Sequence, residues 1–332
     1  MNHQSIHLTS GEIASLWSCY INNSMSKVIL SFLLKHLQDP TIKETVKLSY
    51  DISKEQLIDL HSFLQHEKFA IPQGFSENDV NPSAPWLFTD VFCLSYVNHM
   101  ARVGMLAYSG FLAMSIRKDV RKFFSNGLTQ ITSLYNKTTD ISLEKGILAR
   151  NPYIMVPKES KFVESTSYLS KKRPLNAIEI SHLSMNILTN TIGEKLCLAF
   201  AQTSSSKEIQ EFMMRGKEIA EKHAKIFAAV LQNENVSVPS TPDMAVSHST
   251  TKTFSDKLLM LHMSLLSASG TGNYATAAAA SQRSDLALNY ERLSLEIGKY
   301  AKSGADMMIK HGWLEQPPGL EDRERLIKKK PD

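Results

Sequence analysis

The sequence has little of what marks a disulfide-stapled, exported or membrane-spanning protein. Its three cysteines, Cys19, Cys93 and Cys197, are odd in number and far apart, so neither a disulfide framework nor a cysteine-rich zinc site is expected. The apolar stretch from Val28 to Leu34, like the others in the chain, is too short to span a bilayer. The N-terminus lacks the basic and apolar regions of a secretory signal. We therefore expect a cytoplasmic protein that is not secreted by the usual signal and has no membrane span.

The sequence also lacks a large excess of positive or negative charge. Lys plus Arg total 37 and Asp plus Glu total 33, which gives a formal net charge of +4. A nucleic-acid-binding protein usually carries a denser basic patch, so nucleic acid is not expected as a partner. Two short basic runs, 171–173 and 328–330, are interpreted as solvated charge, with contact to an acidic partner as the alternative.

The chain of 332 residues repeats itself. A shift of 167 aligns residues 8–72 with 175–239, and 12 of these 65 pairs are identical. A shift of 166 aligns 88–152 with 254–318, and 13 of those 65 pairs are identical. Random pairs of this composition would match at roughly 6%. The repeat predicts a tandem duplication, divided as a first bundle 1–152, a linker 153–173, a second bundle 174–318 and a charged tail 319–332.

Each repeat reads as four helices with no strand pattern of useful length. Capping boxes at Thr9–Glu12 and Asn176–Glu179 open the first helix, and Gly146 and Gly312 close the fourth. We expect third helices at 87–115 and 253–281, and fourth helices that begin at Asp119 and Asp285 as N-caps. The proline-containing loop 70–86 is long enough to return along the bundle. This predicts an all-α fold of two tandem ferritin-like four-helix bundles with long crossover loops.

One motif recurs at the turn between the third and fourth helices. It reads Tyr-x4-Ala-x-Ser-x-Arg-x-Asp in both repeats, and its members are Tyr108, Ala113, Ser115, Arg117, Asp119, Tyr274, Ala279, Ser281, Arg283 and Asp285. In the structural interpretation, Ser ends one helix, Asp caps the next, and Arg pairs with turn carbonyls or a carboxylate. In the functional interpretation, the turn is an anion or partner site with an arginine beside a helix N-terminus. The structural one is preferred because capping is the commoner use of such turns.

A ferritin-like bundle raises the question of a di-iron or di-manganese centre, which needs Glu-x-x-His on two helices. The pattern occurs once, at Glu179–His182, where the capping box already explains the glutamate. These two residues stay weak metal candidates, and no cofactor is expected. His61 and His262 are interpreted as structural histidines, and the 14 methionines as core filler. No catalytic triad or phosphate-binding loop can be assembled, so no catalytic or cofactor-binding residue is assigned.

The turn motif together with the segment 312–318, Gly-Trp-Leu-Glu-Gln-Pro-Pro, resembles an uncharacterised family of spore-forming bacteria, the domain of unknown function 3231. The family is related to the spore coat protein F group, and its members are often tandem duplications. The first repeat departs from the pattern with Gly-Ile-Leu-Ala-Arg-Asn-Pro at 146–152. The resemblance implies a ferritin-like bundle associated with sporulation and supplies no catalytic residue.

The sequence therefore favours a non-enzymatic structural or interaction protein, associated with sporulation or the spore coat. Protein partners or self-association are expected, because duplication can place a former homodimer in one chain. The alternative is a bundle that binds a metal or a small ligand at a non-standard site.

Overall fold

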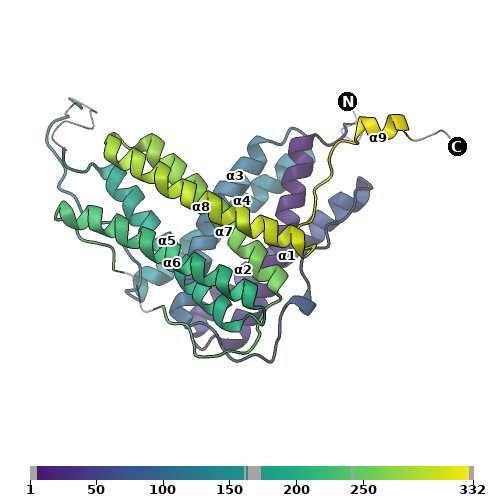
Figure 1. The fold of residues 1–332 in the computed structure, drawn as a ribbon, viewed down its shortest axis with the longest axis horizontal. Coiled ribbons are helices and arrows are strands. Elements are labelled where there is room, and N and C mark those ends of the chain that lie inside the picture. Colours follow the sequence, from purple (N-terminus) through teal and green to yellow (C-terminus); the bar gives the residue numbers. More distant parts are fainter. Residues whose placement is uncertain (1–5, 161, 164–172, 241, 243, 329–332) are drawn as a thin grey trace.

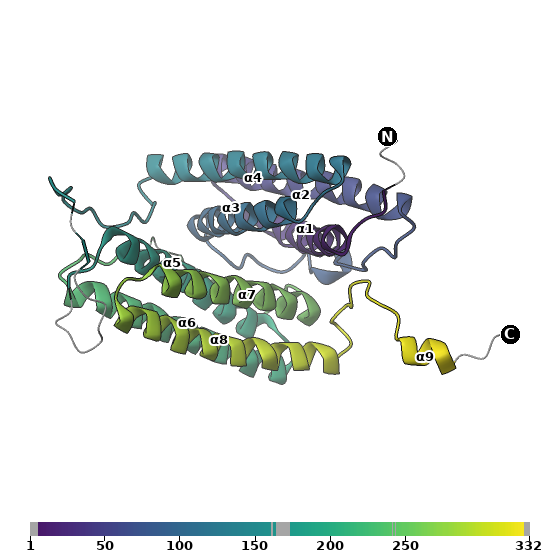
Figure 2. The ribbon, with the colours of Figure 1, turned by 90° about the horizontal axis from the view of Figure 1, so that it is seen from above.

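The computed structural model describes residues 6–160, 162–163, 173–240, 242 and 244–328. The described residues form two groups of four long helices with connecting loops, and Figure 2 shows one group above the other. The helices of the first group are α1 (Ser10–His36), α2 (Pro40–His66), α3 (Asp90–Ala113) and α4 (Lys118–Glu144). Those of the second are α5 (Ala177–Thr203), α6 (Lys207–Asn233), α7 (Asp256–Ala280) and α8 (Ser284–Lys310). A short helix, α9 (Arg323–Lys328), lies within the charged tail (Figure 1).

The predicted helix ends are largely confirmed. Thr9 and Asn176 form capping boxes with Glu12 and Glu179. Gly146 and Gly312 each adopt φ of +67°, a left-handed conformation that favours glycine, and the following residues bond back into the helix end. The prediction that Asp119 and Asp285 cap the fourth helices is wrong. The N-cap residues are Arg117 and Arg283, because the two aspartates turn back to bind these arginines.

The second and third helices of each group run parallel. The Asp90 carboxylate, at the start of α3, accepts hydrogen bonds from the backbone of Gln38 and Asp39, in the turn between α1 and α2. In the second group, the Ser204 hydroxyl donates to Asp256 at the start of α7, 2.7 Å away. The chain therefore returns along the whole bundle before the third helix begins. The all-α fold of two tandem helical bundles with long crossovers is confirmed.

The two crossovers pair with each other. Val80 bridges Phe254, and Phe88 bridges Val246, both in antiparallel fashion. Adding 166 to 80 and 88 gives 246 and 254, so the two bridges exchange equivalent positions. Among the described residues these isolated bridges are not extended into a strand. The pairing is isologous, as in a two-fold symmetric dimer, although both partners belong to one chain.

A continuous hydrophobic core joins the two groups. It contains buried side chains from both halves, such as Phe32 and Phe92 from the first and Phe200 and Phe254 from the second. The rings of Phe32 and Phe254 meet edge to face with centroids 5.3 Å apart. Each group also has a smaller cluster of its own near the turn between its third and fourth helices. The halves are therefore held together by burial of apolar surface, at about 25 cal/mol per Å².

Candidate functional site

The repeated turn motif forms a closed network of charged groups at one end of each bundle. Glu12 is buried at the start of α1, and its carboxylate accepts backbone hydrogen bonds from Ile116 and Arg117 at 2.9 and 2.7 Å. The same carboxylate closes the capping box by accepting from the backbone of Thr9 at 2.8 Å. Burial raises the pKa of Glu12, but these backbone hydrogen bonds outweigh it, so the pKa is lowered overall.

Arg117 joins the turn to the end of α2. Its guanidinium binds Asp119 through Nε and one terminal nitrogen, both at 2.8 Å, and binds Glu67 through the other terminal nitrogen at 2.6 Å. That nitrogen also donates to the carbonyl of Ile6 at 3.3 Å. The Arg117 side chain is 7% exposed. Its donors are thus directed at groups of the same chain.

The second half repeats the network residue for residue. Arg283 binds Asp285 at 3.1 and 2.9 Å and Glu234 at 2.6 Å, while Glu179 accepts from the backbone of Gln282 and Arg283 at 3.1 Å. Ser115 and Ser281, the motif serines, donate to the carbonyls of Phe111 and Ala277 at the ends of α3 and α7. Each network therefore ties together all four helices of its bundle.

Of the two weak metal candidates, Glu179 belongs to this second network, and His182 follows it on α5. Glu179 is buried, and besides its backbone partners it binds Arg173 through both oxygens at 2.9 and 2.6 Å. His182 is half-buried, and burial lowers its pKa. Within the described ranges, no group of three His, Cys, Asp or Glu residues is placed to hold a metal ion.

The structure describes one residue of each of the two basic runs. Arg173 contacts Glu179, and Lys328 is exposed at the end of α9. Residues 171, 172, 329 and 330 lie outside the described residues.

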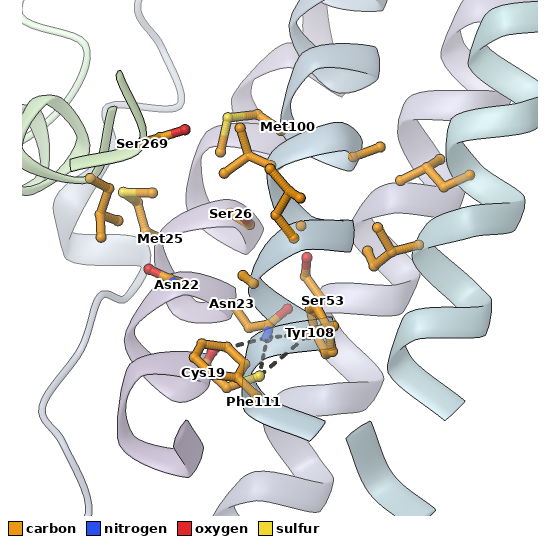
Figure 3. Close-up of a pocket in the computed structure, with 18 of the residues that line it drawn as sticks. Cys19, Asn22, Asn23, Met25, Ser26, Ser53, Met100, Tyr108, Phe111 and Ser269 are labelled. Atoms are coloured by element: carbon orange, nitrogen blue, oxygen red, sulfur yellow. Dashed lines mark hydrogen bonds between the residues drawn. The ribbon is translucent and has the colours of Figure 1, made fainter. Parts of the chain in front are cut away.

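The motif tyrosines belong to a different site, in the middle of each bundle. Tyr108 reaches a cavity of about 520 Å³ that α1 to α4 and α7 line. Figure 3 shows Cys19, Asn23 and Tyr108 together, with Met100 and Ser269 elsewhere along the cavity. The Asn23 amide donates to the Tyr108 hydroxyl at 3.2 Å, and the Cys19 thiol donates to it at 3.3 Å. Burial raises the pKa of Cys19 to about 12, so the thiol stays protonated and is a poor nucleophile.

A chain of hydrogen bonds leads from Tyr108 toward the surface. The Tyr108 hydroxyl donates to the Gln56 carbonyl, and the Gln56 amide donates to Gln130 at 3.0 Å. Gln130 in turn donates to Glu55 at 3.2 Å. Each donor in this series points toward the surface, so Tyr108, Gln56 and Gln130 each donate to the next side chain.

The second half builds the same chain with titratable groups. His223 stands at the position of Gln56 and Glu296 at that of Gln130, by the shifts of 167 and 166. Asn190 donates to Tyr274 at 2.8 Å, Tyr274 meets His223 Nδ1 at 3.1 Å, and His223 Nε2 meets Glu296 at 3.0 Å. Because the Glu296 carboxylate can only accept, neutral His223 carries its proton on Nε2 and accepts from Tyr274 at Nδ1.

A second buried histidine group lies between the bundles. The Tyr96 hydroxyl meets His262 Nε2 at 3.0 Å, which confirms His262 as a structural histidine. His99 is buried nearby with no hydrogen-bond partner on either ring nitrogen. Burial lowers the pKa of His99 to about 3, with Arg102 and His262 adding repulsion, and lowers that of His262 to about 4. His61, in contrast, is exposed on α2 and does not belong to the core.

Sequence reasoning missed several of these residues. Glu67 and Glu234 are among the identical pairs of the repeat, so their repetition was a usable signal for the charged network. Gln56, Gln130, His223 and Glu296 differ between the repeats, so identity could not reveal them. Their shared position inside the bundle becomes visible only when the tertiary contacts are known.

The fold and the repeated networks define an all-α protein made of two tandem helical bundles. Residues 1–159 and 163–326 each match the family described as "Protein of unknown function (DUF3231)". The chain therefore belongs to this family and contains two copies of its domain.

Two similar proteins add context. The "Uncharacterized protein YvdQ" of Bacillus subtilis (strain 168) is 25% identical over 129 residues, which is 37% of this chain and 75% of that protein. A crystal structure from Bacillus halodurans C-125, described as a "putative spore coat protein", is 20% identical with a TM-score of 0.40. That match covers 48% of this chain and 100% of the other. None of the described helices is long and apolar enough to cross a membrane.

Proposed function

We propose that this chain is a non-enzymatic structural or interaction protein that associates with the spore and binds a protein partner or a second copy of itself. The repeated motif residues support a structural role, because the guanidinium donors of Arg117 and Arg283 bind carboxylates of their own bundle and carbonyls of the chain just before its first helix. An external anion would have to displace these partners. Association with the spore is supported by the resemblance of the turn motif and of residues 312–318 to a family of spore-forming bacteria.

One observation carries the interaction role. The segment after the first bundle presents three large apolar side chains to solvent: Tyr153 is 86% exposed, Met155 87% and Val156 83%. Proline at 152 and 157 flanks this segment and disfavours a helix through it. Neighbouring exposed apolar side chains of this size are typical of contact surfaces.

The test replaces Tyr153, Met155 and Val156 by Ser in a fluorescent fusion produced in a sporulating Bacillus host, with light scattering on the purified protein. The unchanged fusion is expected to concentrate on the developing spore, and the variant to be diffuse or to lose self-association. Leu288→Ser with Leu295→Ser is the matched control, because both are exposed on α8 at 53% and 69%. A diffuse unchanged fusion would contradict spore association, and a variant indistinguishable from the unchanged chain in both assays would contradict the interaction role of 153–156.

A second candidate function, a bundle that binds a small ligand, is favoured by the cavity of about 520 Å³ beside Tyr108. Elemental analysis of untagged protein tests the metal form of this candidate. Stoichiometric iron, manganese or zinc would replace the non-enzymatic proposal with a metal-centred one.

A further inference from the structure

The cavity of the first bundle is lined without charge. The residues along it include Met25, Met100, Leu134 and Leu265, together with serine, asparagine and threonine, and none is Asp, Glu, Lys, Arg or His. An ionised ligand would lose its hydration there without gaining a counter-ion, which is strongly unfavourable. A neutral and largely apolar molecule has no ionic hydration to lose when it enters the cavity.

The second bundle shows that this cavity is not an unavoidable product of the fold. The equivalent space, between Asn190, Tyr274 and Ile297, is about 70 Å³. Tyr300 helps to fill it, at the position that Leu134 occupies in the first bundle, and its ring stacks on Phe212 with centroids 4.3 Å apart. The same backbone positions can therefore be packed or left open, according to the side chains placed on them.

A glycine makes room for this filling. Gly216 takes the position of Ser49, and a Cβ atom on it would lie 2.3 Å from the Tyr300 hydroxyl. Ser49 and Leu134 both line the open cavity of the first bundle. With Ser49 and Leu134, the first bundle therefore keeps its cavity open. With Gly216 and Tyr300, the second bundle fills the equivalent space.

Polar groups at one part of the cavity supply an anchor. The Tyr108 hydroxyl and the Asn23 amide are hydrogen-bonded to each other, and both residues line the cavity with Cys19 (Figure 3). The hydroxyl also accepts from the Cys19 thiol and donates to Gln56, so a ligand donor would bind it by replacing the thiol, which is the weaker of its two donors.

We propose that the first bundle binds a neutral, mainly apolar small molecule carrying one hydrogen-bonding group, seated between Leu134 and Leu265 with that group at Tyr108. This deepens the second candidate function by naming its ligand class. The cavity volume is within the range of small-molecule sites, and its lining of apolar side chains with a few polar groups is typical of them.

The test is a fluorescence titration with N-phenyl-1-naphthylamine, a neutral aromatic amine with one N–H donor. The unchanged chain should bind it saturably. The double variant Ser49→Gly with Leu134→Tyr copies the filled bundle and is expected to bind it about tenfold or more weakly. Its midpoint of thermal unfolding should stay equal or rise, because filling a cavity restores packing contacts.

Two further variants make the comparison specific. Leu295→Tyr introduces the same side chain at a position that is 69% exposed on α8, and binding should be unchanged. Gly216→Ser with Tyr300→Leu transfers the open arrangement to the second bundle, and a second binding event should appear. Full binding by the filled double variant would overturn the proposed site.

The ligand class is tested separately with 8-anilino-1-naphthalenesulfonate, an anion of similar shape. Binding of the neutral probe alone supports the inference. Cavity-dependent binding of the anion instead would overturn the ligand class while the small-ligand function stands. Failure of both probes to bind the unchanged chain would overturn the inference and the second candidate function together.

Discussion

His99 is the clearest polar residue whose burial opposes its ionisation. The equivalent position in the second repeat holds Leu265, which shows that an apolar side chain fits this part of the helix. Burial lowers the pKa of His99 to about 3 and that of His262 to about 4, both below the usual value of 6.5. Between the lowered pKa values of the folded state and the usual value of 6.5, the unfolded chain therefore binds more protons than the folded chain. The folded state loses stability as the pH falls below about 6.5.

We predict that His99→Leu reduces the acid sensitivity of the protein. One buried histidine should destabilise the fold by about 2 kcal/mol at pH 5 relative to pH 7, because one pKa unit corresponds to about 1.4 kcal/mol. The variant should therefore lose about half of the decrease that His99 and His262 cause together. The free energy of unfolding by urea, measured from pH 7.5 to pH 4.5, provides the check.

The control for this prediction is His61→Leu, because His61 is an exposed histidine on α2. Its pH dependence should match that of the unchanged chain. An equal slope for all three proteins would show that His99 is not the source of the acid sensitivity.

Close helix packing depends on particular glycines. Gly127 in α4 lies against the ring of Tyr108, and a Cβ atom there would lie 2.4 Å from a ring carbon. Gly298 in α8 is exposed and has nothing within 4 Å of such an atom. The same substitution at these two positions separates packing from helix propensity, because both lie inside helices of 27 residues.

We predict opposite signs for the two alanine variants. Gly298→Ala should raise the free energy of unfolding by about 0.5 to 1 kcal/mol, since alanine favours the helix. Gly127→Ala should lower it by about 1 to 3 kcal/mol, because the new methyl group displaces Tyr108 and its hydrogen bonds. Chemical denaturation of both variants tests this prediction. A Gly127→Ala variant more stable than the unchanged chain would contradict it, because Tyr108 would then have moved without a decrease in the free energy of unfolding.

The positions of helices follow from local sequence signals, whereas the links between them do not. Capping boxes at Thr9 and Asn176 and the stops at Gly146 and Gly312 act within a few residues, so the sequence was sufficient. The role of Asp119 was misjudged because its partner is the Arg117 side chain. The cavity depends on how much of the bundle interior the side chain fills at the shared position of Leu134 and Tyr300, and this requires the packed structure.

At the scale of the whole molecule, we propose that the halves, 1–152 and 174–318, form one folding unit. Their shared core and paired crossovers make separate unfolding of either half unfavourable. A protease site placed between residues 157 and 163 should be cut without separation of the two fragments in gel filtration. Calorimetry of the uncut chain should show a single transition. Two transitions, or fragments that elute apart, would contradict one cooperative unit.

Tyr96 and His262 occupy equivalent places in the two repeats and meet each other across the internal two-fold relation. In a homodimer, such a place on the axis brings a residue against its own copy, so it could only pair tyrosine with tyrosine or histidine with histidine. Fusion of the two copies into one gene removes that restriction. Each half became free to acquire its own side chains, and a donor could evolve opposite a matching acceptor.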